Sequence, residues 1–214
     1  MICPRCCGFD DLFSAKVLAR QLRRYRKKGP LKTTRLLIDA LRSHGAADHT
    51  LLDIGGGIGA IQHELVKAGV TQVTSVEGSA ASISAAREEA TQQGYADRAQ
   101  YYHADFVDVA ERIESADIVT LDRVVCCYPD MKELVGQSAQ KAQRLYGLVY
   151  PRDTALVRII GPVMNLIHRL KRIAFRFYLH RPDEIDQVLR AAGLRLQSKQ
   201  QTLIWHVAVY ARGD

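Results

Sequence analysis

Residues 51–60 read LLDIGGGIGA, and this stretch decides the fold of the 214-residue chain. Its first residues complete a short apolar strand, and the glycines that follow prevent a regular strand from continuing. From Ile61 onward the apolar residues recur at helical spacing. A strand, a glycine turn and a helix bring backbone N–H groups and a helix N-terminus close to a ligand, and glycine leaves room for that approach. We therefore expect a ligand-binding loop here.

The acidic residue two positions before the first glycine indicates which ligand this loop binds. Asp53, Gly55, Gly57 and Gly59 form a D-x-G-x-G-x-G pattern, whereas dinucleotide folds carry G-x-G-x-x-G. A carboxylate at the mouth of the loop repels a pyrophosphate and favours a cationic ligand. The pattern resembles the first motif of the class I S-adenosylmethionine-dependent methyltransferases. This resemblance implies S-adenosylmethionine as the cofactor and S-adenosylhomocysteine as the product.

Acidic residues follow two of the next expected strands. Glu77 ends an expected strand at 72–77 and lies about 20 positions beyond Gly55, the separation that places an acid on ribose hydroxyls. In the family, an acid with an apolar neighbour after the next strand contacts the adenine, and Asp105 and Phe106 match this pair. The resemblance implies cofactor contacts for Asp53, Gly55, Gly57, Gly59, Glu77, Gly78, Ser79, Asp105, Phe106 and Asp122.

Strands and helices alternate through most of the chain, which favours a parallel sheet covered on both faces. Helices are expected at 14–28, from a cap at Thr33 or Thr34 to about 44, and at 80–93, 131–144 and 183–192, and strands at 99–103, 116–121 and 145–150. The last strands, 194–201 and 202–211, have so little between them that they form an antiparallel hairpin. We expect an α/β, Rossmann-like class I methyltransferase fold: a mostly parallel seven-stranded sheet with an antiparallel C-terminal hairpin and helices on both faces.

Two regions fall outside that alternation. Residues 1–48 are expected to form an N-terminal helical cap with a cysteine-containing head, and 49–214 the methyltransferase domain. This domain carries an inserted amphipathic segment at about 152–181, whose apolar residues at 163, 166, 167, 170 and 173 have helical spacing. Three interpretations of the segment stay open: a lid over the acceptor, packing into the core, or a helix on a membrane surface.

The catalytic candidates are residues expected near the methyl acceptor. Methyl transfer from a sulfonium needs alignment and a group that accepts a proton, so no fixed catalytic dyad is required. We expect Asp122, Tyr128 and His180 to be the catalytic candidates, and packing of the loop is the alternative for Tyr128. The loop 122–129 lacks the Asn/Asp-Pro-Pro-aromatic tetrad of many amino- and nucleobase-methylating relatives, which argues against base methylation.

Composition is that of a globular protein with a basic surface. The net charge is +7, and arginines and lysines gather in residues 20–35 and 169–176. Such clusters fit an anionic substrate, RNA or a solvated helix face. Cys3, Cys6, Cys7, Cys126 and Cys127 do not form a disulfide framework, and no signal peptide or membrane-spanning run is present, so we expect a cytoplasmic location with reduced thiols.

The function expected from these features is methylation of a small, anionic or aromatic acceptor at oxygen or nitrogen. The general layout resembles, weakly, tetrapyrrole and quinone-pathway O-methyltransferases. The alternatives are RNA methylation and a cysteine-based metal or metalloid-binding protein on a methyltransferase scaffold, although no metal site is predicted. A nicotinamide dehydrogenase is disfavoured by Asp53 and the hairpin. The acceptor itself and the oligomeric state are not readable from the sequence.

Overall fold

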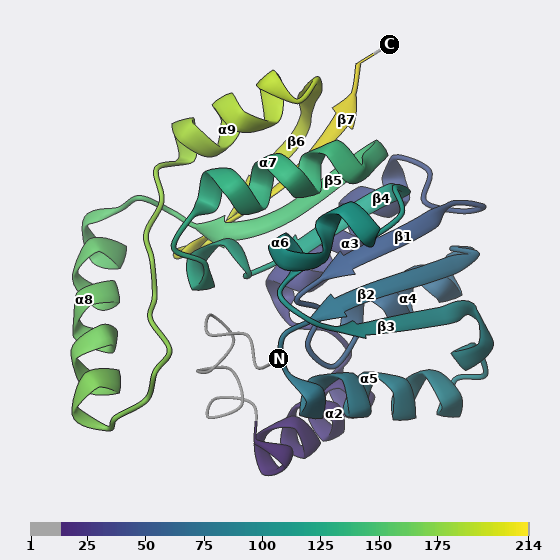
Figure 1. The fold of residues 1–214 in the computed structure, drawn as a ribbon, viewed down its shortest axis with the longest axis horizontal. Helices are drawn as coiled ribbons and strands as arrows, with labels where there is room; N and C mark the ends of the chain where they lie inside the picture. The colour runs from purple at the N-terminus through teal and green to yellow at the C-terminus, as the bar shows by residue number, and fades with distance from the viewer. Residues whose placement is uncertain (1–13, 214) are drawn as a thin grey trace.

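A seven-stranded sheet forms the centre of the computed structural model, which describes residues 14–213 (Figure 1). Its strand order is β3-β2-β1-β4-β5-β7-β6, in which β1 to β5 are parallel and β7 runs antiparallel to both β5 and β6. The expected fold class is therefore confirmed. The strands are β1 Thr50–Ile54, β2 Gln72–Glu77, β3 Ala99–His103, β4 Ala116–Asp122, β5 Ala142–Pro151, β6 Leu194–Gln201 and β7 Trp205–Arg212.

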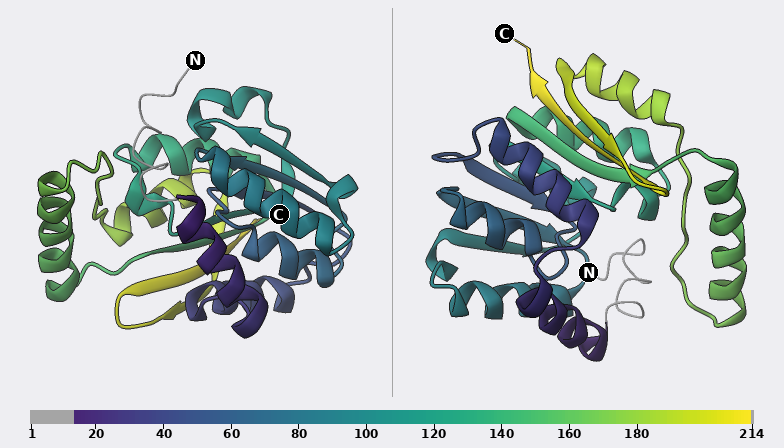
Figure 2. Two further views of the ribbon diagram at one scale, coloured as in Figure 1. Left: turned by 90° about the horizontal axis from the view of Figure 1, so that it is seen from below. Right: turned by 180° about the vertical axis from the view of Figure 1, so that it is seen from behind.

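Helices cover both faces of this sheet, as Figures 1 and 2 show. On one face α6, α7 and α9 share a core with the strands through residues such as Phe106, Leu134 and Leu189. On the other, α3 and α4 do so through Leu37 and Leu65. The helices are α2 Ala15–Lys28, α3 Lys32–Ser43, α4 Ala60–Lys67, α5 Ala80–Gln92, α6 Phe106–Val109, α7 Met131–Lys141, α8 Ala155–Leu170 and α9 Pro182–Ala191. Within residues 14–213, none of them is long and apolar enough to cross a bilayer.

The strand order creates a crevice for a ligand. The chain lays β2 and β3 on one side of β1, and then returns to place β4 and β5 on the other side. Loops that leave β1 and β4 at their carboxyl ends therefore diverge, and such a switch point is where open α/β sheets bind ligands.

Three expected boundaries are wrong. Helix α7 ends at Lys141 rather than 144, since Ala142 already pairs with Ala116 in the sheet. Strand β7 begins at Trp205 rather than 202, because Thr202 accepts and donates hydrogen bonds to Trp205 across a turn. Neither candidate threonine caps α3, which begins at Lys32 and buries both of them.

The inserted segment is a helix at the periphery of the molecule. Helix α8 spans Ala155–Leu170, and residues 171–181 return beside it as an extended segment toward α9 (Figures 1 and 2). The expected apolar position at 173 lies beyond the helix. Most apolar side chains of α8 are exposed, so the interpretation that the segment packs into the core is wrong.

Candidate functional site

A cavity of about 340 Å³ opens at the carboxyl ends of β1, β2, β3 and β4. The loops after these strands supply most of its wall, and α2 with the start of α3 closes one side. The lining includes Gln21, Arg24, Tyr25, Pro30, Leu31, Thr34, Ile54, Gly55, Gly56, Gly57, Ile58, Glu77, Gly78, Ala104, Asp105, Phe106, Asp122, Arg123, Val124, Cys127 and Tyr128. Most of the predicted cofactor residues thus share one cavity, and Asp53, Gly59 and Ser79 lie behind its wall.

The glycine loop needs glycine for three different reasons. Gly55, Gly57 and Gly59 have positive φ angles of 65°, 58° and 76°, which side chains rarely adopt. At Gly56 the obstacle is steric, because a Cβ atom there would lie 2.1 Å from Oδ2 of Asp53. At Gly57 a Cβ atom would meet no atom within 4 Å, so this residue faces open space where a ligand can approach the backbone.

Asp53 supports the loop from below. Its side chain is fully buried, and it accepts hydrogen bonds from Thr120 Oγ1 at 2.7 Å and from Gln62 Nε2 at 2.9 Å. Burial raises the pKa of Asp53 to about 6, although both hydrogen bonds oppose this shift. The nearby carboxylates of Asp122 and Glu77 raise this pKa further. The structure therefore places Asp53 where it organises the loop and lends negative potential to the cavity.

This raised pKa predicts a pH-dependent stability. Between pH 4 and 6 the folded protein keeps a proton on Asp53 that the unfolded chain has lost, so the stabilisation is complete below about pH 4 and disappears as pH rises through 6. We expect the contribution to fall by on the order of 3 kcal/mol between pH 4 and pH 7. Urea unfolding of the parent and Asp53→Asn across this range should diverge by that amount, in favour of the variant at high pH.

The variant should still fold, because its new amide has a partner. Oε1 of Gln62 is buried, and no described atom donates to it, so a flipped Gln62 amide can accept from an asparagine at 53. Asp97→Asn changes an exposed carboxylate and serves as the matched control. Parallel pH profiles for the parent and Asp53→Asn would contradict the assignment.

Glu77 joins two loops of the cavity wall. Its Oε2 accepts the N–H of Gly57 at 3.0 Å, and its Oε1 accepts the N–H of Ser79 at 2.9 Å. Burial raises the pKa of Glu77, and these backbone hydrogen bonds act against that shift by stabilising the carboxylate. The carboxylate therefore stands at the cavity wall with its position fixed by both loops.

A buried histidine that the sequence did not single out holds the glycine loop from the helix side. Nε2 of His63 donates to the carbonyl of Ile58 at 2.7 Å, and Nδ1 accepts from the Tyr95 hydroxyl. Burial lowers the pKa of His63 to about 4, so the ring is neutral at physiological pH. The same ring leaves little room for a side chain at Gly59, where a Cβ atom would lie 3.0 Å from it. No sequence pattern pairs His63 with Tyr95, since only the fold brings them together.

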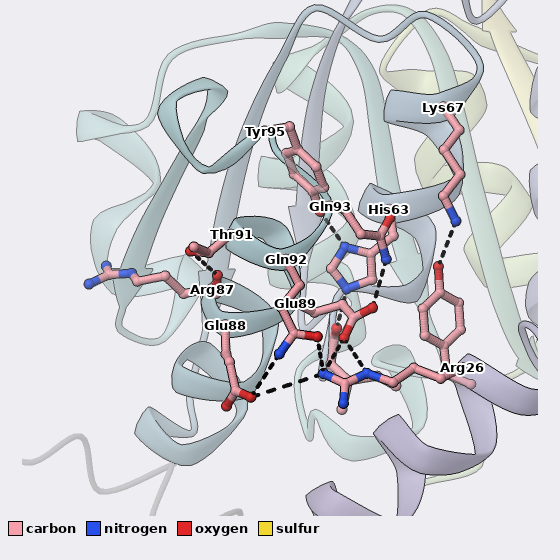
Figure 3. A network of polar contacts seen from close by, with 12 residues as sticks. Arg26, His63, Lys67, Arg87, Glu88, Glu89, Thr91, Gln92, Gln93 and Tyr95 are labelled. Carbon is pink, nitrogen blue, oxygen red and sulfur yellow. Dashed lines mark hydrogen bonds and ion pairs between the residues drawn. The ribbon is translucent and has the colours of Figure 1, made fainter.

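Helix α2 is held over the cavity by charged contacts to α5. Figure 3 shows Arg26 reaching Glu89, whose Oε2 accepts from Nε at 2.8 Å, and Gln92, whose Oε1 accepts from Nη2 at 2.7 Å. On the next face of α2, the Tyr25 hydroxyl donates to Glu64 of α4 at 2.7 Å. These anchors place Arg24 and Gln21 in the cavity wall.

The third strand end carries Asp105, Phe106 and their partner Tyr128. Asp105 caps the short helix α6, which the sequence analysis had not predicted, through a hydrogen bond from the Val107 N–H to Oδ1 at 3.0 Å. Its Oδ2 accepts from the Tyr128 hydroxyl at 3.2 Å. Tyr128 is buried in the same core cluster as Phe106 and also lines the cavity, so packing and cavity lining coexist in this residue.

Asp122 lies at the end of β4, between the expected cofactor end and the expected acceptor end of the site. Its Oδ2 accepts from Thr34 of α3 at 2.5 Å, and Nε of Arg123 donates to Oδ1 at 3.0 Å. Arg123 has a φ of 63°, a left-handed conformation that turns its side chain back onto Asp122. A hydroxyl and a guanidinium thus stabilise this carboxylate at the cavity wall.

The third catalytic candidate and the cysteines lie around the rim. Nε2 of His180 donates to the carbonyl of Tyr128 at 2.9 Å, and the ring lines a second hollow rather than the cavity. Cys127 reaches the cavity, and its Sγ lies 3.9 Å from that of the buried Cys126. Their contact and burial raise the pKa of the Cys126 thiol well above its usual range. No metal-binding cluster exists within residues 14–213, and Cys3, Cys6 and Cys7 lie outside the described residues.

Comparisons with known proteins agree with this architecture. Residues 52–143 match a family model described as a methyltransferase domain, and no curated protein matches the chain. A magnesium protoporphyrin IX methyltransferase from Synechocystis PCC 6803 with bound SAH is similar in structure at 18% identity, with a TM-score of 0.72 over 96% of this chain and 98% of the other. The structure of the same enzyme with bound SAM is 16% identical, with a TM-score of 0.71 over 99% of this chain and 98% of the other.

Two further solved structures share the fold. A putative sarcosine dimethylglycine methyltransferase from Galdieria sulphuraria is 15% identical, with a TM-score of 0.69 over 88% of each chain. A complex of the Haloferax volcanii Trm112 methyltransferase activator with a putative methyltransferase gives 14% identity and a TM-score of 0.70 over 96% of each chain. The chain therefore has the class I methyltransferase fold, and its residues 52–143 match the methyltransferase-domain model, which confirms the resemblance seen in its sequence.

Proposed function

We propose that this protein transfers a methyl group from S-adenosylmethionine to an oxygen or nitrogen of a small acceptor. The observation that carries the proposal is the convergence of four strand ends on one cavity, which gathers the glycine loop, Glu77, Asp105 and Asp122. The bound cofactor would supply a methyl group already activated by its sulfonium. The task left to the chain is to align donor and acceptor and to manage one proton.

The cofactor end of the cavity fits a cationic ligand with a ribose and a flat base. The open space at Gly57 allows close approach of the ligand to the backbone of the glycine loop. Glu77 presents a fixed carboxylate to ribose hydroxyls, while Asp105 and the buried Phe106 line the side expected for the base. The buried carboxylate of Asp53 favours the positive charge of a sulfonium rather than a pyrophosphate.

The acceptor end fits an apolar molecule with an anionic group. Leu31 and Val124 supply apolar surface, and the guanidinium groups of Arg24 and Arg123 lie in the same wall. Asp122, whose side chain accepts hydrogen bonds from Thr34 and Arg123, is placed to orient the acceptor or take its proton. The Tyr128 hydroxyl donates a hydrogen bond to Asp105, so we assign this residue to the shape of the pocket and not to the role of a base. His180 has no part in this scheme because it lies outside the cavity.

Thermal unfolding with S-adenosylhomocysteine tests the cofactor, with NAD as the comparison ligand. A ligand at about 100 times its Kd adds roughly 2.7 kcal/mol to the free energy of unfolding. For a domain of this size we expect a rise in Tm of about 5–10 °C with S-adenosylhomocysteine and none with NAD. A rise with NAD alone would replace the proposal with a dehydrogenase, and no rise with either ligand would contradict an active methyltransferase.

A further inference from the structure

Helix α8 exposes a continuous apolar stripe that the cavity does not use. The exposed fractions are 66% for Ile159, 56% for Leu166 and 76% for Leu170, high values for side chains of this size. The full stripe recurs at i, i+3, i+4 and i+7 spacing and so occupies one side of the helix. It consists of Leu156, Ile159, Ile160, Val163, Leu166, Ile167 and Leu170.

The opposite side of α8 is the side that the protein covers. Asn165 donates from Nδ2 to the carbonyl of Phe177 at 2.8 Å and accepts the N–H of Phe177 at 2.7 Å. The Phe177 ring lies so close to Gly161 that a Cβ atom there would be 2.9 Å away. Val157 and Gly161 are buried on this side. The returning segment 171–181, which runs beside α8 in Figure 1, therefore contacts the side of the helix opposite the apolar stripe.

Charge along this part of the chain has a single sign. From 154 to 182 there is no aspartate or glutamate, and the cations are Arg158, Arg169, Lys171, Arg172, Arg176 and Arg181. Of these, Arg158 is paired with Asp153, which precedes this range. Arg169, Lys171 and Arg172 are exposed at the C-terminal end of the stripe. An apolar stripe bordered by cations and free of acids is complementary to an anionic lipid surface, whose acyl boundary accepts the stripe and whose headgroups accept the cations.

Two other partners fit these features less well. A stable dimer buries about 800 Å² per partner, whereas the stripe of a 16-residue helix about 24 Å long offers on the order of a few hundred Å². A second copy packed on the stripe would also place its own cations near those of the first, and like charges repel. RNA would use the cations and leave the apolar stripe in water. The helix is too short to cross a bilayer, which needs about 20 residues, so it lies along the surface.

We infer that α8 docks this protein on anionic membrane surfaces, with the apolar stripe in the interface and Arg169 and Lys171 against lipid headgroups. The inference depends on the exposed stripe and its charges alone and is independent of the proposed methyl transfer. Of the three interpretations left open for this segment, it selects the helix on a membrane surface rather than a lid over the acceptor, because no residue of α8 lines the cavity.

Flotation of the full chain with lipid vesicles tests the inference. We expect binding to phosphatidylcholine vesicles that contain about one-third phosphatidylglycerol, and much weaker binding to phosphatidylcholine alone. Leu166→Gln with Leu170→Gln should weaken binding at least about tenfold. Arg169→Gln with Lys171→Gln should weaken it about tenfold on the anionic vesicles only. Because all four side chains are exposed, the Tm of each variant should stay at the parent value.

Matched controls change equally exposed residues elsewhere. Leu203→Gln removes a leucine that is 71% exposed in the β6–β7 turn, and Arg20→Gln with Arg23→Gln removes two exposed cations of α2. Both should bind vesicles as the parent does. Failure of the parent to bind vesicles, or undiminished binding by the leucine variant, would overturn the inference. If the leucine variant binds vesicles undiminished and the protein also binds RNA, the surface is one for nucleic acid.

Two further outcomes would name a different occupant. Sedimentation velocity that finds a dimer in the parent and a monomer in the leucine variant would assign the stripe to a second copy. Vesicle binding that appears only after deletion of residues 2–13 would assign it to that segment of the chain. Either result would overturn membrane docking as the role of α8.

Discussion

Gly56→Ala is expected to lower the free energy of unfolding by about 3–5 kcal/mol and to weaken S-adenosylhomocysteine binding at least about 100-fold. The new Cβ atom would lie 2.1 Å from Oδ2 and 2.9 Å from Cγ of Asp53, and 2.8 Å from Nε2 of Gln62. These atoms are buried and hydrogen-bonded to one another, so they cannot move aside without breaking the support of the loop. Urea unfolding and calorimetric titration measure the two effects.

Gly57→Ala is the matched comparison because it separates stability from binding. Its φ of 58° costs an alanine about 1–2 kcal/mol, but its Cβ atom would meet no protein atom within 4 Å. We expect a small loss of stability together with at least tenfold weaker binding, since the methyl group projects toward the ligand. Parent-like behaviour of Gly56→Ala would refute the support of the loop by Asp53. Undiminished binding by Gly57→Ala would mean that the ligand does not approach the loop.

Glu77→Gln is expected to weaken S-adenosylhomocysteine binding by about 1–3 kcal/mol, or about 5- to 150-fold, while the protein still folds. The amide loses the charge and keeps only one of the two oxygens, which accept from the N–H groups of Gly57 and Ser79 separately. Because burial already raises the pKa of Glu77, the loss of its charge also removes a desolvation cost, which limits the effect on stability.

Calorimetric titration of Glu77→Gln measures this effect directly. Glu114→Gln changes an exposed glutamate far from the cavity and should bind as the parent does. Equal affinity of Glu77→Gln and the parent would remove Glu77 from the ribose site.

Local sequence determined the scaffold of the site. The glycine loop, the strand that ends at Glu77 and the terminal hairpin could each be predicted, because a strand, its turn and the element that follows are contiguous in the chain. Parallel strands then bring their carboxyl ends to one edge, so Glu77, Asp105 and Asp122 gather around one cavity without further information. The order of the strands in the sheet was not predicted and came from the tertiary structure.

The tertiary structure alone decided what each side chain meets. Thr34 was one of two candidates for a helix cap, and it contacts Asp122 instead, 88 positions away. His63 is fixed by Tyr95, and Asp53 supports the loop from a buried position behind the cavity wall. The apolar positions of α8 could be found from their spacing, but their exposure could not, because periodicity identifies an apolar face and not its partner. Burial, partner and pKa depend on segments distant in sequence, and only the folded chain brings these together.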